Sequence, residues 1–567
     1  GKTCLLRAAE RGCEFVSVSP IKDDFEINAP CTFIMPRPAT DVTVMMAMAY
    51  HLITTGQFDK EYLNRYTVGF DRFAAYLQGE ADGVVRDARW AEGVSGVPAD
   101  QIRDLADMAW RKNTHITVSY ALQRAEHGEQ PIWMALVLNA MLGSARNKGG
   151  GFSYALSSLG NNGKPSLDVP LPTLPQGQNR VGRYIPVARI ADMLLHSHGR
   201  FTYKCRTLHY PDIKVVYWAG GNPFHHHQDL QRLTRACAQV DTFIVHENVG
   251  TATARCADIV FPATVTLERE DVGASANDPF LIPMNKCAEP LEGARHDYDI
   301  FSQLSMRLGI EDAFTEGRSA DAWLREIYEP TRQALEEKGY FAPSWDEFQN
   351  HGNIPLPISE GASALERFHE DPDAYPLRTP SGKIEIYCQT IADAGFCGHP
   401  AWHEPQEWLG APLAQKHPFQ LIANQPRYRL HSQLDFGAAS MAHKVDGRET
   451  IRMCTKMSQD LGVIDRDVVL VWNDRGGFLA SVLVDDHLMD KVLQVSTGAW
   501  YAPKDLGLPF LVCVNGNPNA LTADRGSSGI GQGCTGQLCL VSLRKWEGEV
   551  PSCVAHEDIV PVIDKRP

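Results

Sequence analysis

The sequence lacks an excess of basic residues and any apolar run long enough to cross a membrane. It holds 54 Lys and Arg against 69 Asp and Glu, which gives a formal net charge of −15. A nucleic acid or an anionic membrane surface is therefore not expected as a partner, because both require clustered Lys and Arg. The longest apolar runs, at 42–53 and 131–142, are far shorter than the roughly 20 residues of a bilayer-spanning helix. We expect buried helices there and no membrane span.

Clustered cysteines and familiar catalytic motifs are missing as well. The 14 cysteines are scattered, and the nearest two, Cys534 and Cys539, are separated by four residues. This spacing excludes a zinc ribbon and a clustered-cysteine iron–sulfur site within these residues. Neither a Gly-x-Ser-x-Gly elbow nor a His-Glu-x-x-His motif occurs. An enzyme that leaves the hard chemistry to a bound cofactor is expected to show many binding residues and few obvious catalytic ones.

The order of the expected elements indicates an α/β protein. At 567 residues, the chain is long enough for roughly three or four domains. Short β-rich runs alternate with helical patterns over its first two-thirds, which is typical of parallel α/β sheets. The expected strands there are 14–18, 114–120, 214–219 and 242–246, and the expected helices are 4–11, 42–55, 101–111, 131–142, 229–238 and 321–338.

From residue 419 the pattern changes to short strands and tight turns, which predicts a separate β-barrel-like domain. Strands are expected there at 467–472, 478–484, 492–496 and 538–543. We also expect a loop at 121–130, a glycine-rich boundary loop within 147–165, a break or kink at Pro330, and irregular connecting structure over 340–417. The predicted domains are 1–165, 166–414 and 415–567.

Polar segments rich in Gly and Pro follow four of the expected strands. They lie at 17–20, 119–124, 220–224 and 245–248. Because ligands of open parallel sheets bind at the carboxyl ends of the strands, several such edges suggest a long ligand with many polar atoms. Ordinary loop chemistry explains the same residues about equally well.

Two features have both a functional and an ordinary interpretation. Asp41 could accept two hydrogen bonds from the Watson–Crick edge of a guanine, or it could cap the helix that follows. The run His225-His226-His227 could bind a metal. Consecutive side chains rarely point at one ion, however. We therefore expect these histidines to support a ligand from behind or to line a substrate funnel, and not to bind a metal directly.

Two phosphate-loop matches are weak. The G-x-G-x-x-G match at 531–536 precedes a strand-like run instead of a helix and is interpreted as accidental. Gly1-Lys2-Thr3 matches the end of a Walker A loop. It leaves a P-loop NTPase as an alternative from another class.

Short motifs spread along the chain resemble those of one enzyme family. They include Arg37-Pro-Ala-Thr-Asp41, Gln123-Arg124, Gly220-Gly-Asn-Pro-Phe224, Thr379-Pro-Ser-Gly-Lys-Ile-Glu-Ile386, Arg429-Leu-His-Ser-Gln433 and Gly498-Ala-Trp500. In this order, nearly collinear from residue 11 to 545, they resemble the molybdopterin oxidoreductases of the dimethyl-sulfoxide reductase type. The trimethylamine-N-oxide, dimethyl-sulfoxide and biotin-sulfoxide reductases form the branch that the chain resembles most.

The resemblance implies a fold, a cofactor and a set of site residues. The fold would be two Rossmann-like doubly wound α/β domains followed by a C-terminal double-psi-type β-barrel domain, and the cofactor Mo-bis(molybdopterin guanine dinucleotide). Arg124 would polarise the substrate oxygen, and Tyr120 would line the substrate funnel beside it. The implied cofactor contacts are Ser19, Pro20, Asp41, Leu122, Gln123, Gly221, Asn222, His226, His246, Glu247, Gln425, Arg429, His431, Ser432, Gln433, Asn519 and Gln537.

The family also implies an activity and partners. The reaction would be reduction of an S-oxide or N-oxide, such as dimethyl sulfoxide, trimethylamine N-oxide, or biotin or methionine sulfoxide, by oxygen-atom transfer. An electron donor such as a c-type cytochrome and a location in the bacterial periplasm are implied by the resemblance alone.

Three departures accompany the resemblance. Ser19 stands where relatives commonly carry an acidic or amide residue, and Cys534-Thr535 where near relatives often have Asn-Cys. The protein ligand to molybdenum, a serine in this branch, is expected upstream of residue 1, as is any export signal. An upstream Cys or selenocysteine ligand would indicate a dehydrogenase of the formate dehydrogenase type. A non-catalytic remnant of the fold is a further alternative.

Overall fold

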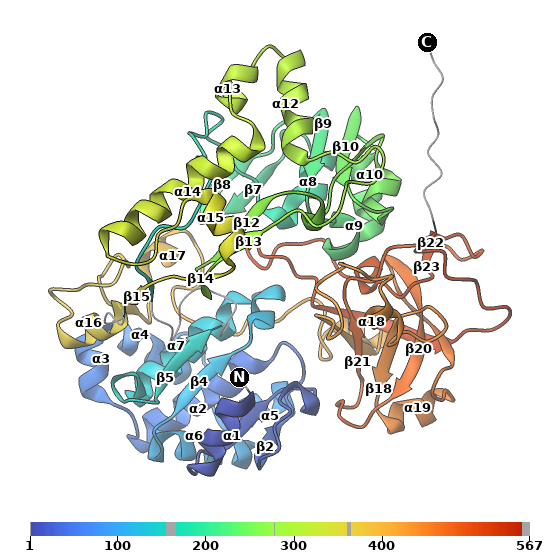
Figure 1. The fold of residues 1–567 in the computed structure, drawn as a ribbon. Helices are drawn as coiled ribbons and strands as arrows, with labels where there is room; N and C mark the ends of the chain where they lie inside the picture. The colour runs from blue at the N-terminus through green and yellow to red at the C-terminus, as the bar shows by residue number, and fades with distance from the viewer. Residues whose placement is uncertain (1, 155–165, 277, 360–363, 558–567) are drawn as a thin grey trace.

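The computed structural model describes residues 2–154, 166–276, 278–359 and 364–557. Figure 1 shows an N-terminal α/β body in blue, a middle α/β body in green to yellow-green and a C-terminal β-barrel in orange to red. We call these the N-terminal body, the middle body and the barrel. The domain limits placed after residues 165 and 414 remain predictions.

Pairs of parallel strands lie at the centre of the N-terminal body. Strand β1 (Phe15–Val18) pairs with β2 (Cys31–Ile34), and β4 (His115–Val118) pairs with β5 (Gly151–Tyr154). The expected helices at 42–55, 101–111 and 131–142 are confirmed as α2 (Asp41–Thr55), α6 (Ala99–Arg111) and α7 (Glu129–Leu142). The remaining elements are α1 (Lys2–Glu10), η1 (Lys22–Asp24), α3 (Lys60–Tyr66), β3 (Thr67–Val68), α4 (Phe70–Leu77), α5 (Ala88–Ser95), η2 (Tyr120–Arg124) and η3 (Ser144–Arg146).

Helix α2 shows how local sequence sets an element of this core. Its apolar run buries Met46, Ala49 and Leu52 completely, so the helix is held by packing on most of its surface. Gly56 ends the helix in the left-handed conformation, with φ 73°, and donates its N–H to the Ile53 carbonyl. Glycine adopts this conformation without a steric penalty, which explains the stop at this position.

A late segment of the chain returns to the N-terminal body. Strand β16 (Ile384–Glu385) pairs in parallel with β3. Phe368, on α16 (Ala364–Glu370), and Ile386 are fully buried in the same apolar core as α2. The expected irregular connection at 340–417 therefore contains short ordered elements: α15 (Trp345–His351), β14 (Ile354–Pro355), β15 (Ile358–Ser359), α16, β16, α17 (Gln389–Asp393) and η6 (Pro412–Gln415).

The middle body contains a three-stranded parallel sheet. Its order is β11 (Ile259–Pro262), β10 (Thr242–Glu247), β9 (Val215–Ala219), which confirms the expected strands at 214–219 and 242–246. Helix α10 (Leu230–Cys237) connects β9 to β10 and buries Leu230 and Leu233. The other elements are β6 (Ser166–Leu167), η4 (Val187–Arg189), α8 (Ile190–Leu195), β7 (Arg200–Tyr203), β8 (Arg206–His209), α9 (Pro223–His226), α11 (Ala252–Cys256), η5 (Thr266–Glu268), β12 (Asp271–Ser275), β13 (Asp278–Met284), α12 (Asp297–Arg307), α13 (Glu311–Thr315) and α14 (Ala320–Glu337).

The barrel is a closed, mixed sheet of six strands. The pairings run β18–β21–β17–β24–β19–β20, and β20 pairs back to β18, so the barrel leaves no open edge among these six. Its strands are β17 (Phe419–Asn424), β18 (Thr450–Met453), β19 (Val468–Asn473), β20 (Gly476–Val484), β21 (Val492–Ser496) and β24 (Leu538–Lys545). Shorter elements are α18 (Ala438–Met441), α19 (Thr455–Leu461), β22 (Pro503–Lys504), β23 (Val512–Cys513) and η7 (Pro518–Ala520).

Three local expectations were wrong. Helix α14 continues through Pro330 to Glu337 without a break, because Tyr328, Thr331 and Leu335 around the proline are buried; packing outweighs the lost backbone hydrogen bond. Part of the expected glycine-rich loop is strand β5, and its residues 155–165 lie outside the described ones. The expected loop at 121–130 contains most of η2 and the first turn of α7.

Replacing Phe368 with Ala tests whether the returning segment belongs to the N-terminal core. We expect Phe368→Ala to lower the free energy of unfolding of this body by about 3–5 kcal/mol, because a fully buried ring is removed. Leu365→Ala, on the same helix but 41 % exposed, is the matched control and should change it by less than about 0.5 kcal/mol. The measurement is the urea midpoint of the tryptophan fluorescence transition; equal shifts for the two variants would contradict the assignment.

Candidate functional site

The three bodies meet through loops that contact one another directly. Residues after β4 form η2, and residues after β9 form α9. The barrel segment 525–537 contacts Arg124 of η2 and Gln228 after α9, and His431 of the barrel segment 425–435 lies near His226 of α9. Figure 1 shows the barrel lying against both α/β bodies. Strand ends and barrel loops thus supply side chains to one junction.

Arg124 of η2 is docked onto the last barrel loop. Its Nη2 donates to Cys534 Sγ at 3.2 Å, and its carbonyl accepts from the Gln537 N–H at 3.3 Å. Just beyond, the His127 N–H donates to the Ser527 carbonyl at 2.8 Å. These contacts fix the C-terminal end of η2 and the residues just after it, and they leave most guanidinium N–H groups of Arg124 outside the contact with Cys534.

His226 marks the point where all three bodies supply a basic side chain. Burial, together with the nearby His227, Arg124 and His431, lowers the pKa of His226 to about 4. Arg124 belongs to the N-terminal body, His226 to the middle body and His431 to the barrel. The junction therefore has an excess of positive potential, which suits an anionic ligand.

His225 presents a buried donor with no partner. Its Nδ1 accepts from the Tyr501 N–H at 3.3 Å, and its ring stacks on Trp500 at 5.6 Å. Burial lowers the pKa of His225 to about 3, so the ring is neutral and its proton lies on Nε2. That Nε2 has no hydrogen-bond partner among the described residues.

The two residues that follow His226 present free acceptors. Nδ1 of His227 lies 3.0 Å from the Gln228 carbonyl, so the proton is on Nδ1 and Nε2 accepts. Neither that Nε2 nor Gln228 Oε1 has a partner in the described part of the chain. Buried polar atoms are normally paired. This set of one donor and two acceptors fits a bound polar heterocycle such as a pterin dinucleotide.

Asn519 and Ser432 hold His225 in place. Asn519 Nδ2 donates to the His225 carbonyl at 3.0 Å, and Asn519 Oδ1 accepts from Thr522 at 2.8 Å. The Ser432 carbonyl accepts from the Trp500 indole at 2.9 Å, and that indole supports the His225 ring. Both predicted residues thus contribute to the junction indirectly, through His225.

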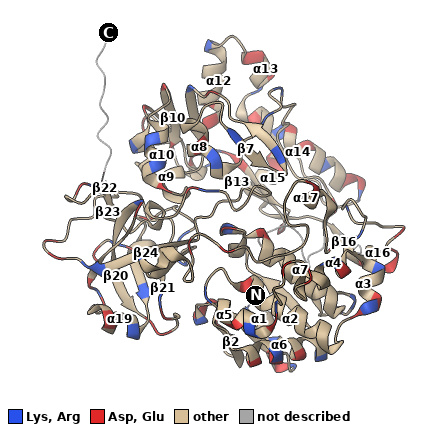
Figure 2. Ribbon diagram, turned by 180° about the vertical axis from the view of Figure 1, so that it is seen from behind, with Lys and Arg blue, Asp and Glu red and all other residues tan. Residues whose placement is uncertain are grey.

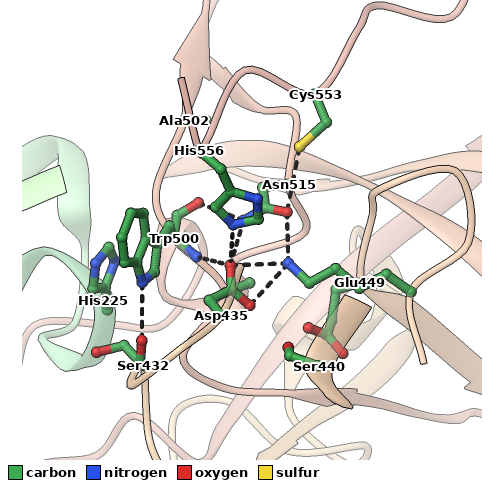
Figure 3. Close-up of polar contacts among 12 residues, drawn as sticks. His225, Ser432, Asp435, Ser440, Glu449, Trp500, Ala502, Asn515, Cys553 and His556 are labelled. Atoms are coloured by element: carbon green, nitrogen blue, oxygen red, sulfur yellow. Dashed lines mark hydrogen bonds and ion pairs between the residues drawn. The ribbon is translucent and has the colours of Figure 1, made fainter. Parts of the chain in front are cut away.

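A buried ion cluster centred on Asp435 lies behind this contact, as Figure 3 shows. Lys444 Nζ is 2.8 Å and His556 Nε2 2.8 Å from the carboxylate, which also accepts from the Trp500 and Asn515 N–H groups at 3.0 Å each. Burial would raise the pKa of Asp435, but the hydrogen bond from His556 and the charges of Lys444 and Arg429 hold it well below its usual range.

Arg429 is engaged by this cluster. Its guanidinium donates to Glu449 at 2.8 Å, to Ser440 at 3.0 Å and to the Thr497 carbonyl at 2.9 Å. The side chain is only 3 % exposed. Arg429 therefore anchors the loop that carries His431 and Ser432, and its Nε alone has no protein partner among the described residues.

Ser19, Pro20 and Asp41 lie at the edge of the N-terminal body. The Ser19 hydroxyl donates to Asp24 at 2.7 Å, and the Pro20 carbonyl accepts from the Met489 N–H of the barrel at 3.1 Å. Asp41 begins α2, where burial raises the pKa of its carboxyl. No ion pair of Asp41 occurs within the described residues, which leaves its carboxylate available to a ligand.

The predicted residues of the middle body differ in whether their polar atoms already have hydrogen-bond partners in the protein. Gly220 and Gly221 adopt left-handed φ values of 82° and 89°, and the Asn222 side chain accepts from Thr253. Both ring nitrogens of His246 are occupied, at 2.8 Å from Tyr217 and 2.7 Å from Asp297. The Glu247 carboxylate accepts from Thr251 and from the Asn248 N–H, and burial raises its pKa.

The other predicted residues present side chains beside the junction. Tyr120 is 39 % exposed, with its ring 5.4 Å from that of Tyr154. Leu122 and Gln123 are partly exposed, Gln425, His431 and Gln433 are exposed, and Gln537 is buried.

Sequence reasoning missed His227, Gln228 and Trp500 and did not choose His225 among the cofactor contacts. The only available signal was the position of 225–228 directly after an expected strand and turn. Which of the three consecutive histidines keeps a buried ring nitrogen without a partner depends on how α9 packs against the barrel, and this is visible only in the structure.

Within the described residues, no group of three or more His, Cys, Asp and Glu side chains is placed to hold a metal ion. Across the same part of the chain, no helix combines the length and the apolar character needed to cross a bilayer.

Comparisons with known proteins agree with this geometry. The model of the molybdopterin oxidoreductase family matches residues 2–307, and that of the molydopterin dinucleotide binding domain matches residues 419–540. The biotin sulfoxide reductase of Cereibacter sphaeroides is 42 % identical over 561 residues, covering 98 % of this chain and 75 % of that protein. The first match includes residues 2 and 3, which removes the basis for a P-loop NTPase.

Other relatives and one solved structure extend the comparison. The dimethyl sulfoxide/trimethylamine N-oxide reductase of Cereibacter sphaeroides is 39 % identical, covering 95 % of this chain and 68 % of that protein. Trimethylamine-N-oxide reductase 1 of Escherichia coli K12 is 36 % identical, covering 95 % and 66 %. Acetylene hydratase from Pelobacter acetylenicus shares the fold, with a TM-score of 0.65 at 16 % identity, over 96 % of this chain and 75 % of that one. The chain therefore belongs to the molybdopterin oxidoreductases, in the dimethyl-sulfoxide reductase family and nearest its S- and N-oxide reductases.

Proposed function

We propose that the chain is part of a reductase of S-oxides or N-oxides that uses Mo-bis(molybdopterin guanine dinucleotide). The observation that carries the proposal is the set of unpartnered buried atoms on His225, His227 and Gln228. The residue between the two histidines, His226, is close enough to Arg124 and His431 to feel their charges, and the relatives of the chain include oxide reductases. A dehydrogenase of the formate type has no comparable support among these relatives.

The cofactor would be held from all three bodies. When bound, it would supply two-electron oxygen-atom transfer. His225 would donate from Nε2, His227 and Gln228 would accept, and the Asp41 carboxylate would accept from the donors of a guanine edge. The barrel, in which β17 pairs in parallel with β21 and β18 with β20, would be of the double-psi type and close over the dinucleotides.

Arg124 would act on the substrate. One of its nitrogens contacts Cys534, and the other N–H groups can donate to the oxygen of a sulfoxide or amine N-oxide. A fixed positive charge there stabilises the negative charge that grows on this oxygen as its bond to sulfur or nitrogen breaks. Tyr120, partly exposed beside η2, would line the path of the substrate.

The partners and the compartment are proposed from the resemblance. An electron donor such as a c-type cytochrome would reduce the enzyme, and the bacterial periplasm would be its location.

The first test is the cofactor content of protein expressed from its complete reading frame. We expect about one molybdenum and two GMP per chain, measured by plasma mass spectrometry and after acid hydrolysis, because the cofactor would carry two guanine dinucleotides. Absence of both would contradict the proposal. GMP without molybdenum would retain the dinucleotide site and locate the failure in the metal ligand.

Arg124 is tested by Arg124→Met and Arg124→Lys. We expect Arg124→Met to lower kcat/KM for dimethyl sulfoxide by about 10²–10³-fold, because the donor to the developing negative charge is lost. The Lys variant should retain part of the rate, since the charge remains without the planar fork. Arg544→Met, at an exposed position on β24, is the control. Unchanged kcat/KM in Arg124→Met, at unchanged cofactor content, would contradict the role.

A further inference from the structure

A basic surface lies on residues 174–209, in a chain whose net charge is −15. The surface, here called the basic apron, carries the exposed cations Arg180, Arg183, Arg200, Lys204 and Arg206. No ion pair involves any of them within the described residues. Figure 2 shows blue basic positions around β7 on this side of the molecule.

The acidic side chains near the apron do not neutralise it. Asp192, the only acidic residue within 174–209, accepts from Arg232 at 2.8 Å and from Tyr210 at 2.7 Å. Asp212 is 3.2 Å from Lys214. Glu316 and Glu326, which line a pocket with Pro175, both pair with Arg318. Because these carboxylates are already paired, the five cations keep their positive potential toward solvent.

Exposed apolar side chains lie among the cations. Leu174, Val181, Tyr184 and Val187 are 54 %, 75 %, 51 % and 73 % exposed. The Tyr184 ring lies 5.6 Å from that of Tyr203, and Lys204 Nζ is 5.9 Å and 5.4 Å from the two ring centroids. Exposed tyrosine and aliphatic side chains interspersed with Arg and Lys in one segment have the composition of a protein interface.

The apron is connected to the proposed reaction site by one loop. The Lys204 N–H donates to the Ile530 carbonyl at 3.0 Å, and Gln532 Nε2 donates to the Thr202 carbonyl at 2.7 Å. The same loop continues to Cys534, which accepts from Arg124. A partner bound on the apron would therefore sit next to the site where an oxide is reduced.

We propose that the basic apron is the docking surface for an acidic electron-carrying protein. The inference rests on the proposed function, since reduction of an oxide consumes two electrons and two protons to release water. The docked carrier is oxidised as it gives up these electrons, one from each of two haem centres or of two successive carrier molecules, and the protons come from solvent. The rest of the chain repels an acidic protein, so the apron both attracts it and orients it. Its exposed tyrosine and aliphatic residues supply the contact once the partner is steered in.

Charge reversal on the apron tests the inference in the complete holoenzyme. Arg180→Glu/Arg183→Glu changes two positions that lie outside helices and strands. The matched control is Arg89→Glu/Arg378→Glu, which makes the same change of net charge at exposed positions of the N-terminal body and the connecting segment. The probes are an acidic c-type cytochrome, a basic c-type cytochrome and vesicles of anionic phospholipid.

Two readouts separate docking from catalysis. We expect Kd for the oxidised acidic cytochrome, measured by calorimetry at low salt, to rise by about 10-fold or more in the apron variant and little in the control. Oxide reduction driven by reduced acidic cytochrome should fall in parallel, while the rate with a small-molecule reductant stays unchanged.

Other outcomes would overturn the inference. Equal cytochrome binding by the apron variant and the control would exclude the apron as the docking surface. Preferential loss of vesicle binding, with cytochrome binding intact, would assign the apron to a lipid surface. Failure of oxide reduction with the small-molecule reductant would contradict the proposed function instead, and the binding measurement would still decide the docking surface.

Discussion

The buried carboxylate of Asp435 is the constraint on which the barrel side of the junction depends. A charge removed from water is tolerated only when donors surround it, and here Lys444, His556, Asn515 and the Trp500 backbone do so. These donors come from four separate segments of the barrel and its C-terminal extension. The hydrogen bonds and ion pairs of this one carboxylate therefore fix the four segments relative to one another. Asp435 and its four partners all lie outside helices and strands, so these contacts replace regular secondary structure there.

The Asp435 cluster also positions a residue of the middle body, His225, through Trp500. The backbone N–H of Trp500 donates to Asp435, its indole donates to the Ser432 carbonyl, and its ring stacks on His225. His225 is thus oriented by a side chain whose own position is set by the ion cluster. The ion cluster positions the Trp500 indole, and the indole in turn sets the orientation of the His225 ring and of its unpartnered Nε2. A site between separate bodies can be preorganised in this way.

The positions of the helices and strands could be predicted from the sequence better than the contacts of their side chains. Strand and helix periodicity located α2, α7, β9, β10 and most of the barrel, because apolar spacing reports packing directly. It could not show that Arg429 would face Glu449, or that both nitrogens of His246 would be occupied. Those facts depend on contacts between residues far apart in sequence. Because these contacts are not visible in the sequence, His226 was predicted as the cofactor contact, whereas the unpartnered ring nitrogens belong to its neighbours His225 and His227.

The loop at 525–537 joins the two surfaces on which turnover would depend. Its Gln532 and Ile530 hold the hairpin of the basic apron, and its Cys534 and Gln537 hold η2 with Arg124. Glycines at 526, 529, 531, 533 and 536 let this loop pass closely between neighbours; a Cβ at Gly529, for example, would lie 2.8 Å from the ring of Phe396. The glycine-rich turn would therefore act as a spacer between the proposed docking surface and Arg124. Its G-x-G-x-x-G match at 531–536 is followed by strand β24 and not by the helix of a phosphate-binding loop.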